Sequence, residues 1–258
     1  MESEELLRDR YLRHIMLEDV GWEGQQKLAK ASVLVVGAGG LGSPVCLYLS
    51  AAGIGKIGVV DYDKVELSNL QRQVIHNTQN LGELKTNSAK QKMQSINPNV
   101  IVDSIPQRFS AKNALSMIEG YDFVIDATDD FPTKFLINHA CVLASKPFSH
   151  AGVLKYGGQT MTFTKGSACL ACAFESPPPK DMLPMFRAGL FGVIPGLMGC
   201  VQAGEAIKYI LGIGNLLTNT LLSIDLKNLN FRKVDLRKND NCDICSEKAI
   251  KSGLRDYD

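Results

Sequence analysis

The apolar positions in the first part of the chain come in short runs that alternate with helical stretches. The runs lie at residues 33–36, 56–60, 100–105, 123–126 and 147–151. Helical patterns follow several of them, for example at Lys85–Ile96, which Asn97-Pro98 ends, and at Phe131–Ser145. Buried strands separated by helices are typical of a parallel α/β sheet, so we expect a Rossmann-like arrangement here.

The pattern changes in the last third of the chain. Gly158–Thr164 and Thr220–Leu236, the latter with a turn near Lys227-Asn228, have the features of antiparallel strands, and a helix is expected between them at Gly199–Leu211. We therefore predict one mixed α/β sheet, with a parallel N-terminal half and an antiparallel C-terminal half.

Two helical stretches precede the first strand. Apolar residues recur within Leu6–Met16 at the spacing of an amphipathic helix, and a second helical stretch runs from Gly21 through Leu28. We expect these helices to pack outside the sheet or against a partner. The whole chain is interpreted as one domain, with N-terminal helices at 1–31, a nucleotide-binding part at 32–151 and a last part at 152–258.

A glycine-rich turn connects the first strand to the next helix. It contains four glycines, Gly37, Gly39, Gly40 and Gly42. Glycines allow a sharp turn and a close approach of a ligand, and the free N–H groups of the helix start favour a phosphate. The second strand ends at Asp61, whose carboxylate is placed to bind a ribose. NAD is the first hypothesis for the nucleotide; a turn that serves close packing alone is the alternative.

Composition excludes several classes of function. The chain has 258 residues and a net charge of +1, which gives no argument for binding nucleic acid or an acidic membrane surface. Its N-terminus is charged and lacks a secretory signal. Ser32–Gly55 carries no charge, but its glycines and Pro44 fit strand, turn and helix better than a membrane span. We expect a cytoplasmic protein.

A group of polar residues changes the nucleotide hypothesis from NAD to ATP. It consists of Asp61, Asp63, Asn69, Arg72, Gln73, Lys85 and Asp129. Hydride transfer does not need two cations and several carboxylates, whereas a triphosphate with magnesium needs both. Each residue alone has an alternative interpretation as a solvated surface side chain.

Four of the seven cysteines form two Cys-x-x-Cys pairs, Cys169 with Cys172 and Cys242 with Cys245. Four thiolates make the closed tetrahedral site that structural zinc prefers, with no position left for a catalytic water. Such a site would connect the C-terminal part of the chain to its middle. Redox dithiols and unliganded cysteines are the alternatives. The other three cysteines, Cys46, Cys141 and Cys200, fall in apolar helical stretches and are interpreted as core residues.

Four motifs together resemble those of the ThiF/MoeB/HesA family, the bacterial relatives of ubiquitin-activating enzymes. They are GAGGLGSP, the pattern D-Y-D-x-V-x-x-x-N-L-x-R-Q, the later DATD, and the two cysteine pairs. The match extends from about Tyr11 to Cys245. The resemblance implies an enzyme that uses MgATP to adenylate the C-terminal Gly-Gly carboxylate of a small ubiquitin-like sulfur carrier and releases pyrophosphate. Residues 152–258 would then bind the carrier.

The resemblance also implies residue roles. Gly39 and Gly42 would lie under the nucleotide and Asp61 would hold the ribose. Three side chains would face the phosphates, namely Asn69, Arg72 and Lys85. Asp129 would bind magnesium, and Arg13 would reach the ATP of the neighbouring subunit in a homodimer. The chemistry agrees, since a carboxylate that attacks phosphorus needs charge neutralisation and alignment rather than a protein nucleophile.

The chain departs from the family pattern in three places. Asp130 replaces the usual Asn, and it is either a further metal ligand or an N-cap. Near the segment matching Arg187-Ala188-Gly189, where some members carry a cysteine, this chain has Met185 and Phe186. We also expect no sulfurtransferase domain after the second cysteine pair. We therefore expect adenylation alone, with sulfur supplied by a separate donor enzyme.

Three functions stay open on the sequence. The first is activation of a carrier for molybdopterin, thiamine, cysteine or tRNA thiolation, which the residues do not distinguish. The second is an NAD-dependent dehydrogenase, which leaves Arg72, Lys85 and the thiolate pairs unexplained. The third is a non-catalytic, zinc-stabilised scaffold.

Overall fold

The computed structural model describes residues 3–179, 188–247, 249 and 253–257. Its helices are α1 (Glu4–Arg10), α2 (Leu12–Ile15), α3 (Gly21–Lys30), α4 (Gly42–Ala52), α5 (Lys85–Ile96), α6 (Ala114–Glu119), α7 (Phe131–Leu143), α8 (Leu170–Phe174) and α9 (Val193–Leu211), with short 3-10 turns η1 (Leu67–Asn69) and η2 (Thr78–Asn80). Its strands are β1 (Ser32–Val36), β2 (Lys56–Val60), β3 (Ile101–Ile105), β4 (Phe123–Asp126), β5 (Phe148–Leu154), β6 (Gly157–Phe163), β7 (Thr220–Asp225) and β8 (Asn230–Asp235).

These strands form one mixed sheet in the order β3-β2-β1-β4-β5-β6-β7-β8. Pairing is parallel from β3 to β5 and antiparallel from β5 to β8. The predicted fold class is therefore confirmed, including the change of strand direction between the two halves.

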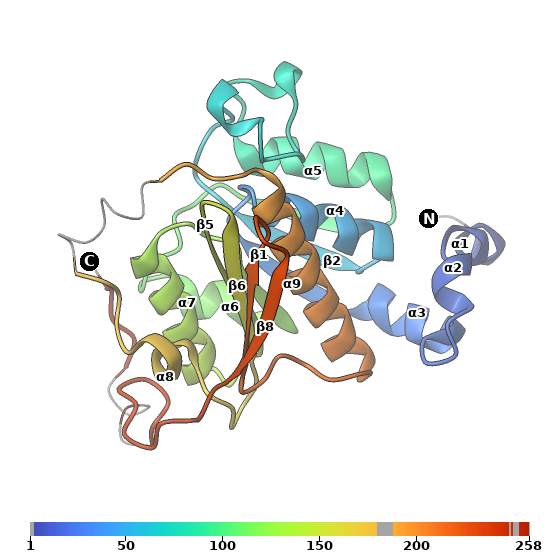
Figure 1. The fold of residues 1–258 in the computed structure, drawn as a ribbon. Coiled ribbons are helices and arrows are strands. Elements are labelled where there is room, and N and C mark those ends of the chain that lie inside the picture. Colours follow the sequence, from blue (N-terminus) through green and yellow to red (C-terminus); the bar gives the residue numbers. More distant parts are fainter. Residues whose placement is uncertain (1–2, 180–187, 248, 250–252, 258) are drawn as a thin grey trace.

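Helices cover both faces of the sheet (Figure 1). Alternate residues of β1 point to opposite faces, so Val33 and Val35 join one apolar core while Leu34 and Val36 join the other. The first core lies beneath α4, α5 and α9, and the second beneath α6, α7 and α8. Because both faces are covered, the parallel strands have continuous apolar sequences.

Several element boundaries differ from the prediction. The expected helix at Leu6–Met16 is divided at Tyr11, whose side chain is buried and whose hydroxyl accepts a hydrogen bond from Asn97 Nδ2 at 2.7 Å. Helix α9 starts at Val193, six residues before the predicted start, and Pro195 does not prevent this because it lies in the first turn, where proline is tolerated. Strand β5 continues to Leu154, beyond the predicted end, through pairing with β6.

The first helices α1 and α2 lie at one end of the molecule, on the opposite side from α7 and α8 (Figure 1). Across the part of the chain that the structure describes, every helix is too short or too polar to cross a lipid bilayer.

Candidate active site and zinc centre

A cavity of about 590 Å³ lies at the carboxyl ends of the parallel strands β1, β2 and β4. Ligands of α/β sheets bind at this edge. Most of the predicted nucleotide residues line it, namely Gly37, Gly39, Gly40, Asp61, Asp63, Arg72, Gln73, Lys85 and Asp129. The chain therefore brings together side chains from three separate loops, as the motifs predicted.

Three of the four glycines of the turn are needed for different structural reasons. Gly37 has a φ of +102°, and an added Cβ would lie 2.5 Å from the Ala127 carbonyl oxygen. A Cβ on Gly42 would collide with the Gly37 carbonyl oxygen, and Gly42 does not line the cavity. Gly39, by contrast, would meet only Gln73 Nε2, at 3.6 Å, among the described residues. Gly37 and Gly42 thus allow the turn to close, and Gly39 leaves space for a ligand.

Asp61 holds this turn in place. Its Oδ2 accepts a hydrogen bond from the Ala38 N–H and its Oδ1 accepts one from the Asp63 N–H, both at 2.8 Å. A carboxylate has about four acceptor sites, so the sites that remain can still accept hydroxyl groups of a ribose. Asp61 therefore has a structural role in the turn, and it keeps acceptor sites for the ribose that the sequence predicts.

His76 also holds the turn, and the sequence did not single it out. Its Nε2 donates to the Ala38 carbonyl oxygen at 2.9 Å, while its Nδ1 contacts Ser88 Oγ at 2.8 Å on α5. Burial lowers the pKa of His76, which keeps the ring neutral and suits this pair of bonds. Ser88 lies one turn after Lys85, so His76 connects the glycine turn to the helix that carries the predicted phosphate ligand.

Two cations face the same cavity. Lys85 is nearly buried and its Nζ lies 2.8 Å from Asp63 Oδ2, while Arg72 donates through Nη1 to the Ser68 carbonyl oxygen at 3.0 Å. Gln73 is buried beside them, and its Oε1 has no hydrogen-bond partner among the described residues. An unsatisfied acceptor in a polar cavity fits a ligand that donates hydrogen bonds, as a nucleotide does.

Asp129 and Asp130 follow β4 and have different roles. Asp129 is exposed and lines the cavity, so its carboxylate can reach a hard metal ion. Asp130 also lines the cavity, but its Oδ1 accepts the Thr133 N–H at 2.9 Å as the N-cap of α7. The N-cap interpretation of Asp130 is therefore confirmed.

Some predicted residues lie outside this cavity. Asn69 is buried and its Oδ1 accepts the Glu66 N–H at 3.2 Å, within the capping box of η1. Arg13 is exposed on α2 and lines neither cavity of its own chain. The positions of Met185, Phe186 and Arg187 lie outside the described residues.

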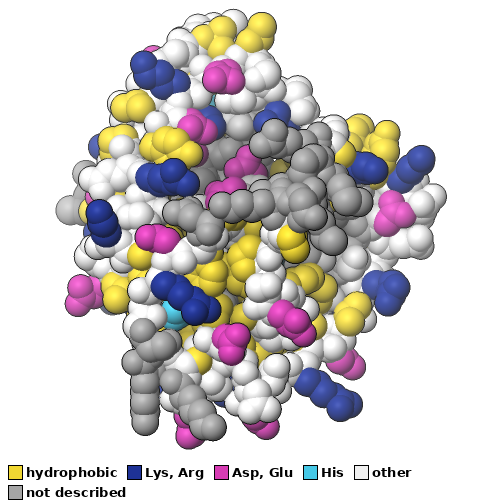
Figure 2. Space-filling view, turned by 90° about the vertical axis from the view of Figure 1, so that its left-hand side faces the viewer, with side chains coloured by type: hydrophobic (Ala, Val, Ile, Leu, Met, Phe, Trp, Pro, Cys, Tyr) yellow, Lys and Arg dark blue, Asp and Glu magenta, His cyan; other side chains and the backbone are white. Residues whose placement is uncertain are grey.

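A second cavity, of about 760 Å³, adjoins the first. Both cavities are lined by Thr128, Asp129, Val153 and Leu154. The walls of the second one are mostly apolar and include Phe131 and Phe135 of α7, and Leu170 and Phe174 of α8. In Figure 2 acidic side chains lie beside a hollow in this side of the molecule, and hydrophobic side chains gather below it.

A buried charged group lies at the edge of the second cavity, and the sequence analysis did not find it. Asp126, at the end of β4, is fully buried, with Lys134 Nζ 3.3 Å from its Oδ1 and His150 Nδ1 2.7 Å from its Oδ2. Burial alone would raise the pKa of Asp126, but Lys134 and His150 outweigh it and hold that pKa at about 2. Asp126 is therefore ionised and paired.

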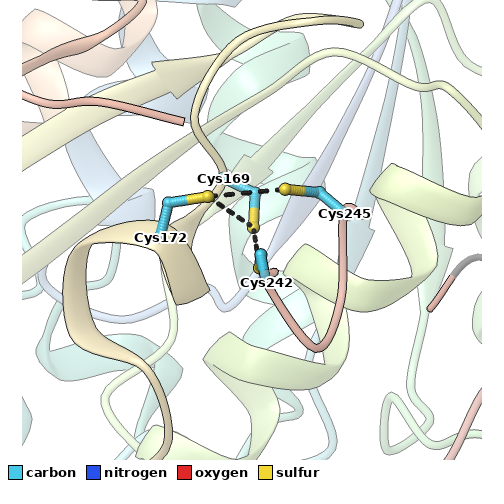
Figure 3. Close-up of side chains that lie close together, drawn as sticks. All are labelled: Cys169, Cys172, Cys242 and Cys245. Atoms are coloured by element: carbon cyan, nitrogen blue, oxygen red, sulfur yellow. Dashed lines mark hydrogen bonds between the residues drawn. The ribbon is translucent and has the colours of Figure 1, made fainter. Parts of the chain in front are cut away.

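The four predicted zinc ligands lie together, with Cys169 and Cys172 at the start of α8 and Cys242 and Cys245 in the C-terminal part of the chain (Figure 3). Their sulfur atoms all lie within 4.8 Å of one another, and neighbouring pairs are 3.4 Å, 3.7 Å and 3.9 Å apart. Four sulfurs at about 2.3 Å from one tetrahedral ion would be about 3.8 Å apart, far more than the roughly 2.05 Å of a disulfide. The donor set and its spacing fit zinc.

Polar groups around these sulfurs support a metal site. The backbone N–H groups of Asn239 and Ile244 point at Cys172 Sγ and Cys242 Sγ, at 3.4 Å and 3.5 Å. Asn138 is buried on α7, where its Nδ2 lies 3.8 Å from Cys169 Sγ and its Oδ1 accepts the Leu170 N–H. Such contacts orient thiolate ligands. The site connects the C-terminal turn to α7 and α8.

Comparison with known proteins agrees with this geometry. The model of the ThiF family matches residues 11–244, so the chain belongs to the ThiF family. The resemblance seen in the motifs is confirmed.

Curated relatives match over nearly the whole chain. The sulfur carrier protein adenylyltransferase of Thermus thermophilus is 44% identical, covering 97% of this chain and 95% of the relative. The SAMP-activating enzyme E1 of Haloferax volcanii is 41% identical, covering 97% and 93%. The adenylyltransferase and sulfurtransferase MOCS3 of Anopheles gambiae is 42% identical, and the match covers 96% of this chain but 57% of that longer protein.

Solved structures show the same fold. The crystal structure of E. coli MccB with succinimide superposes with a TM-score of 0.82 at 22% identity, over 95% of this chain and 75% of MccB.

Proposed function

We propose that this chain uses MgATP to adenylate the C-terminal Gly-Gly carboxylate of a small ubiquitin-like sulfur carrier. The observation that carries the proposal is the junction of two cavities at Thr128 and Asp129, one polar and cationic, the other largely apolar. ATP fits the first, and an extended protein tail fits the second. Family membership and the names of the most similar relatives favour this function over a dehydrogenase or an inert scaffold.

The proposed reaction needs no protein nucleophile. A carboxylate oxygen of the tail forms a bond to the α-phosphorus, and the bond from that phosphorus to the bridging oxygen breaks as pyrophosphate leaves. Arg72 and Lys85 would neutralise the phosphates, and the site's task is alignment and charge stabilisation. Bound magnesium would supply further neutralisation of charge, held by Asp129.

We expect Lys85 to exchange one partner for another when ATP binds. In this structure its ammonium group is paired with Asp63, whose side chain is half exposed. A triphosphate carries more charge than one carboxylate, so we expect it to displace Asp63 from Lys85 when it binds. Asp63 would then keep Lys85 in position between turnovers.

Exchange of labelled pyrophosphate into ATP tests the function. The chain is mixed with carriers of the molybdopterin, thiamine and tRNA-thiolation type, each made intact and without its last glycine. We expect exchange with at least one intact carrier and none with its shortened form, together with a mass gain of AMP on the intact carrier. Exchange that is absent with all carriers, or equal with both forms, would contradict the proposal.

We propose further that the active unit is a homodimer that shares its sites. Arg13 lies on a surface that carries several exposed apolar side chains, namely Leu6, Leu12, Met16 and Leu17. Exposed apolar groups of this kind favour an interface. The Arg13 guanidinium would neutralise phosphate charge on the partner, as an arginine finger does.

Mixing two inactive variants tests the shared site. Arg13→Ala and Asp129→Ala are combined under conditions that allow subunits to exchange, and mixed dimers are confirmed by mass. If Arg13 acts on the partner, each mixed dimer has one site without any lesion, so exchange activity returns. If it acts within its own chain, every site keeps one lesion and the mixture stays inactive.

A further inference from the structure

The buried group of Asp126, Lys134 and His150 has no part in the chemistry described so far. All three residues are at least nine-tenths buried, and Lys134 and His150 line the second cavity. A buried ion pair is weak evidence for a role in stability, because desolvation offsets much of its attraction. A buried charged group at the wall of a cavity is instead a candidate for ligand binding.

His150 presents an acceptor to this cavity. Its Nδ1 lies 2.7 Å from the ionised Asp126, which can only accept a hydrogen bond, so Nδ1 carries the proton of the neutral ring. Burial lowers the pKa of His150, which favours the neutral form. Nε2 is then a lone-pair acceptor, and among the described residues nothing donates to it. A Cβ added at Gly152 would lie 3.9 Å from His150 Nε2 and 3.7 Å from Gln159 Nε2, so this glycine leaves space open beside the acceptor.

Lys134 presents a donor beside it. One N–H of its ammonium group is directed to the Ala151 carbonyl oxygen at 2.6 Å, and another is shared between the two oxygens of Asp126 at 3.3 Å and 3.4 Å. An ammonium group has three N–H donors, so one is left over for the cavity. Asp126 keeps both side chains in fixed orientations.

We propose that His150 and Lys134 bind the main chain of the carrier's tail, with His150 Nε2 accepting a peptide N–H and Lys134 Nζ donating to a peptide or carboxylate oxygen. One acceptor next to one donor is the complement of a peptide unit in an extended strand. This inference rests on the proposed function. It assigns the recognition of the tail to its backbone, which suits glycines that offer no side chain.

Carriers altered in the backbone test the inference on the unmodified enzyme. A carrier that supports exchange is made by semisynthesis with sarcosine in place of its last or its penultimate glycine, which replaces the N–H by N–CH₃. A matched carrier has alanine there, which adds the methyl to Cα and keeps the N–H. We expect one sarcosine position to raise the KM for the carrier about tenfold over its alanine control, with the KM for ATP unchanged.

His150→Ala then measures the coupling between the His150 side chain and the peptide N–H of the carrier. Without the acceptor, the same sarcosine should raise the KM for the carrier less than about twofold over the alanine carrier. The control is His139→Ala, at a buried histidine that lines neither cavity, and it should show the same sarcosine effect on this KM as the parent protein. Lys134→Arg keeps a donor and should retain most affinity for the carrier.

The outcomes distinguish a failure of tail binding by His150 and Lys134 from a failure of the proposed adenylation. If sarcosine and alanine carriers behave alike with the unmodified enzyme, or if the sarcosine penalty is equal in His150→Ala, the inference is wrong while the proposed function stands. If the unmodified carrier supports no exchange at all, both fail.

Discussion

The two cavities of this chain are adjacent but are built in different ways. The first is lined by loops that follow three parallel strands, and its polar residues come in sequence motifs. The second is lined mainly by the β5–β6 hairpin, α7 and α8, and its polar residues are scattered over several elements, such as Lys134 on α7, His150 on β5 and Gln159 on β6. A phosphate site needs charge and glycine at fixed points after strands, whereas a site for an extended tail depends on packing. The first kind of site is therefore readable in a sequence and the second is not.

Removal of the metal should have the largest effect on stability, and it should affect the second cavity more than the first. Helix α8, which follows Cys169, supplies Leu170 and Phe174 to the second cavity and nothing to the first. Structural zinc contributes about 10 kcal/mol or more of apparent binding free energy, so Cys172→Ser should lower the free energy of unfolding by on the order of 5 kcal/mol. Elemental analysis, calorimetry and the KM values for ATP and carrier check this.

The matched control for the metal site is Cys200→Ser. Cys200 is a half-buried cysteine of α9 outside the cluster. We expect one zinc per chain in the parent and in Cys200→Ser, and a loss in Cys172→Ser that weakens carrier binding more than ATP binding. Parent protein without zinc but with full stability would contradict the site.

Substitution of Asp129 should impair the function of both cavities together. Because it lines both, Asp129→Ala should reduce pyrophosphate exchange by about 10³-fold or more, the scale of a lost electrostatic clamp at phosphate. Asp130→Asn is the control, since Asn also serves as an N-cap and removes the charge alone. Full exchange in Asp129→Ala would remove this residue from the mechanism, and a large loss in Asp130→Asn would make Asp130 a second metal ligand.

The acid sensitivity of Asp126 tests the buried wall of the second cavity. A folded-state pKa of about 2, below the usual 3.8, contributes stability above pH 4 that is lost as the pH falls through 2. The amount is about 2 kcal/mol. The lowered pKa values of His76, His139 and His150 also remove stability in acid, but from pH 6.5 downward.

Asp126→Asn should lack the lower step, which is the loss of stability between pH 4 and pH 2. It should also destabilise the protein by about 3 kcal/mol or more, because Lys134 stays buried without its counter-charge. Asp235→Asn, on the exposed face of β8, is the control and should change neither. Urea unfolding between pH 2 and pH 7 measures both quantities. An unchanged lower step in Asp126→Asn would contradict the ionised pair.

The sequence predicted the sheet and its change of direction because buried strands leave continuous apolar runs. It missed α6 and α8, whose five or six residues are too few for a helical period to show. Asp61 and Arg72 were predicted because they belong to a motif that follows a strand end, and Lys85 because it is a cation at the start of a predicted helix. His76, Lys134 and His150 were missed because isolated polar residues acquire a role only through the tertiary contacts that bury them.

The smallest expected effect concerns Gly39, and it distinguishes a glycine that makes room for a ligand from one that closes a turn. An added methyl at Gly39 meets ordinary contact with Gln73 Nε2 alone among the described residues, so Gly39→Ala should fold with nearly unchanged stability. The methyl would occupy space in the first cavity and raise the KM for ATP about tenfold, leaving the KM for the carrier unchanged.

Gly120→Ala, at an open position after α6 outside both cavities, controls for the substitution itself and should leave both KM values unchanged. Gly42→Ala should instead destabilise the protein, since its Cβ would collide with the Gly37 carbonyl oxygen. Equal KM values for ATP in Gly39→Ala and the parent would show that the nucleotide does not lie against Gly39 in the first cavity.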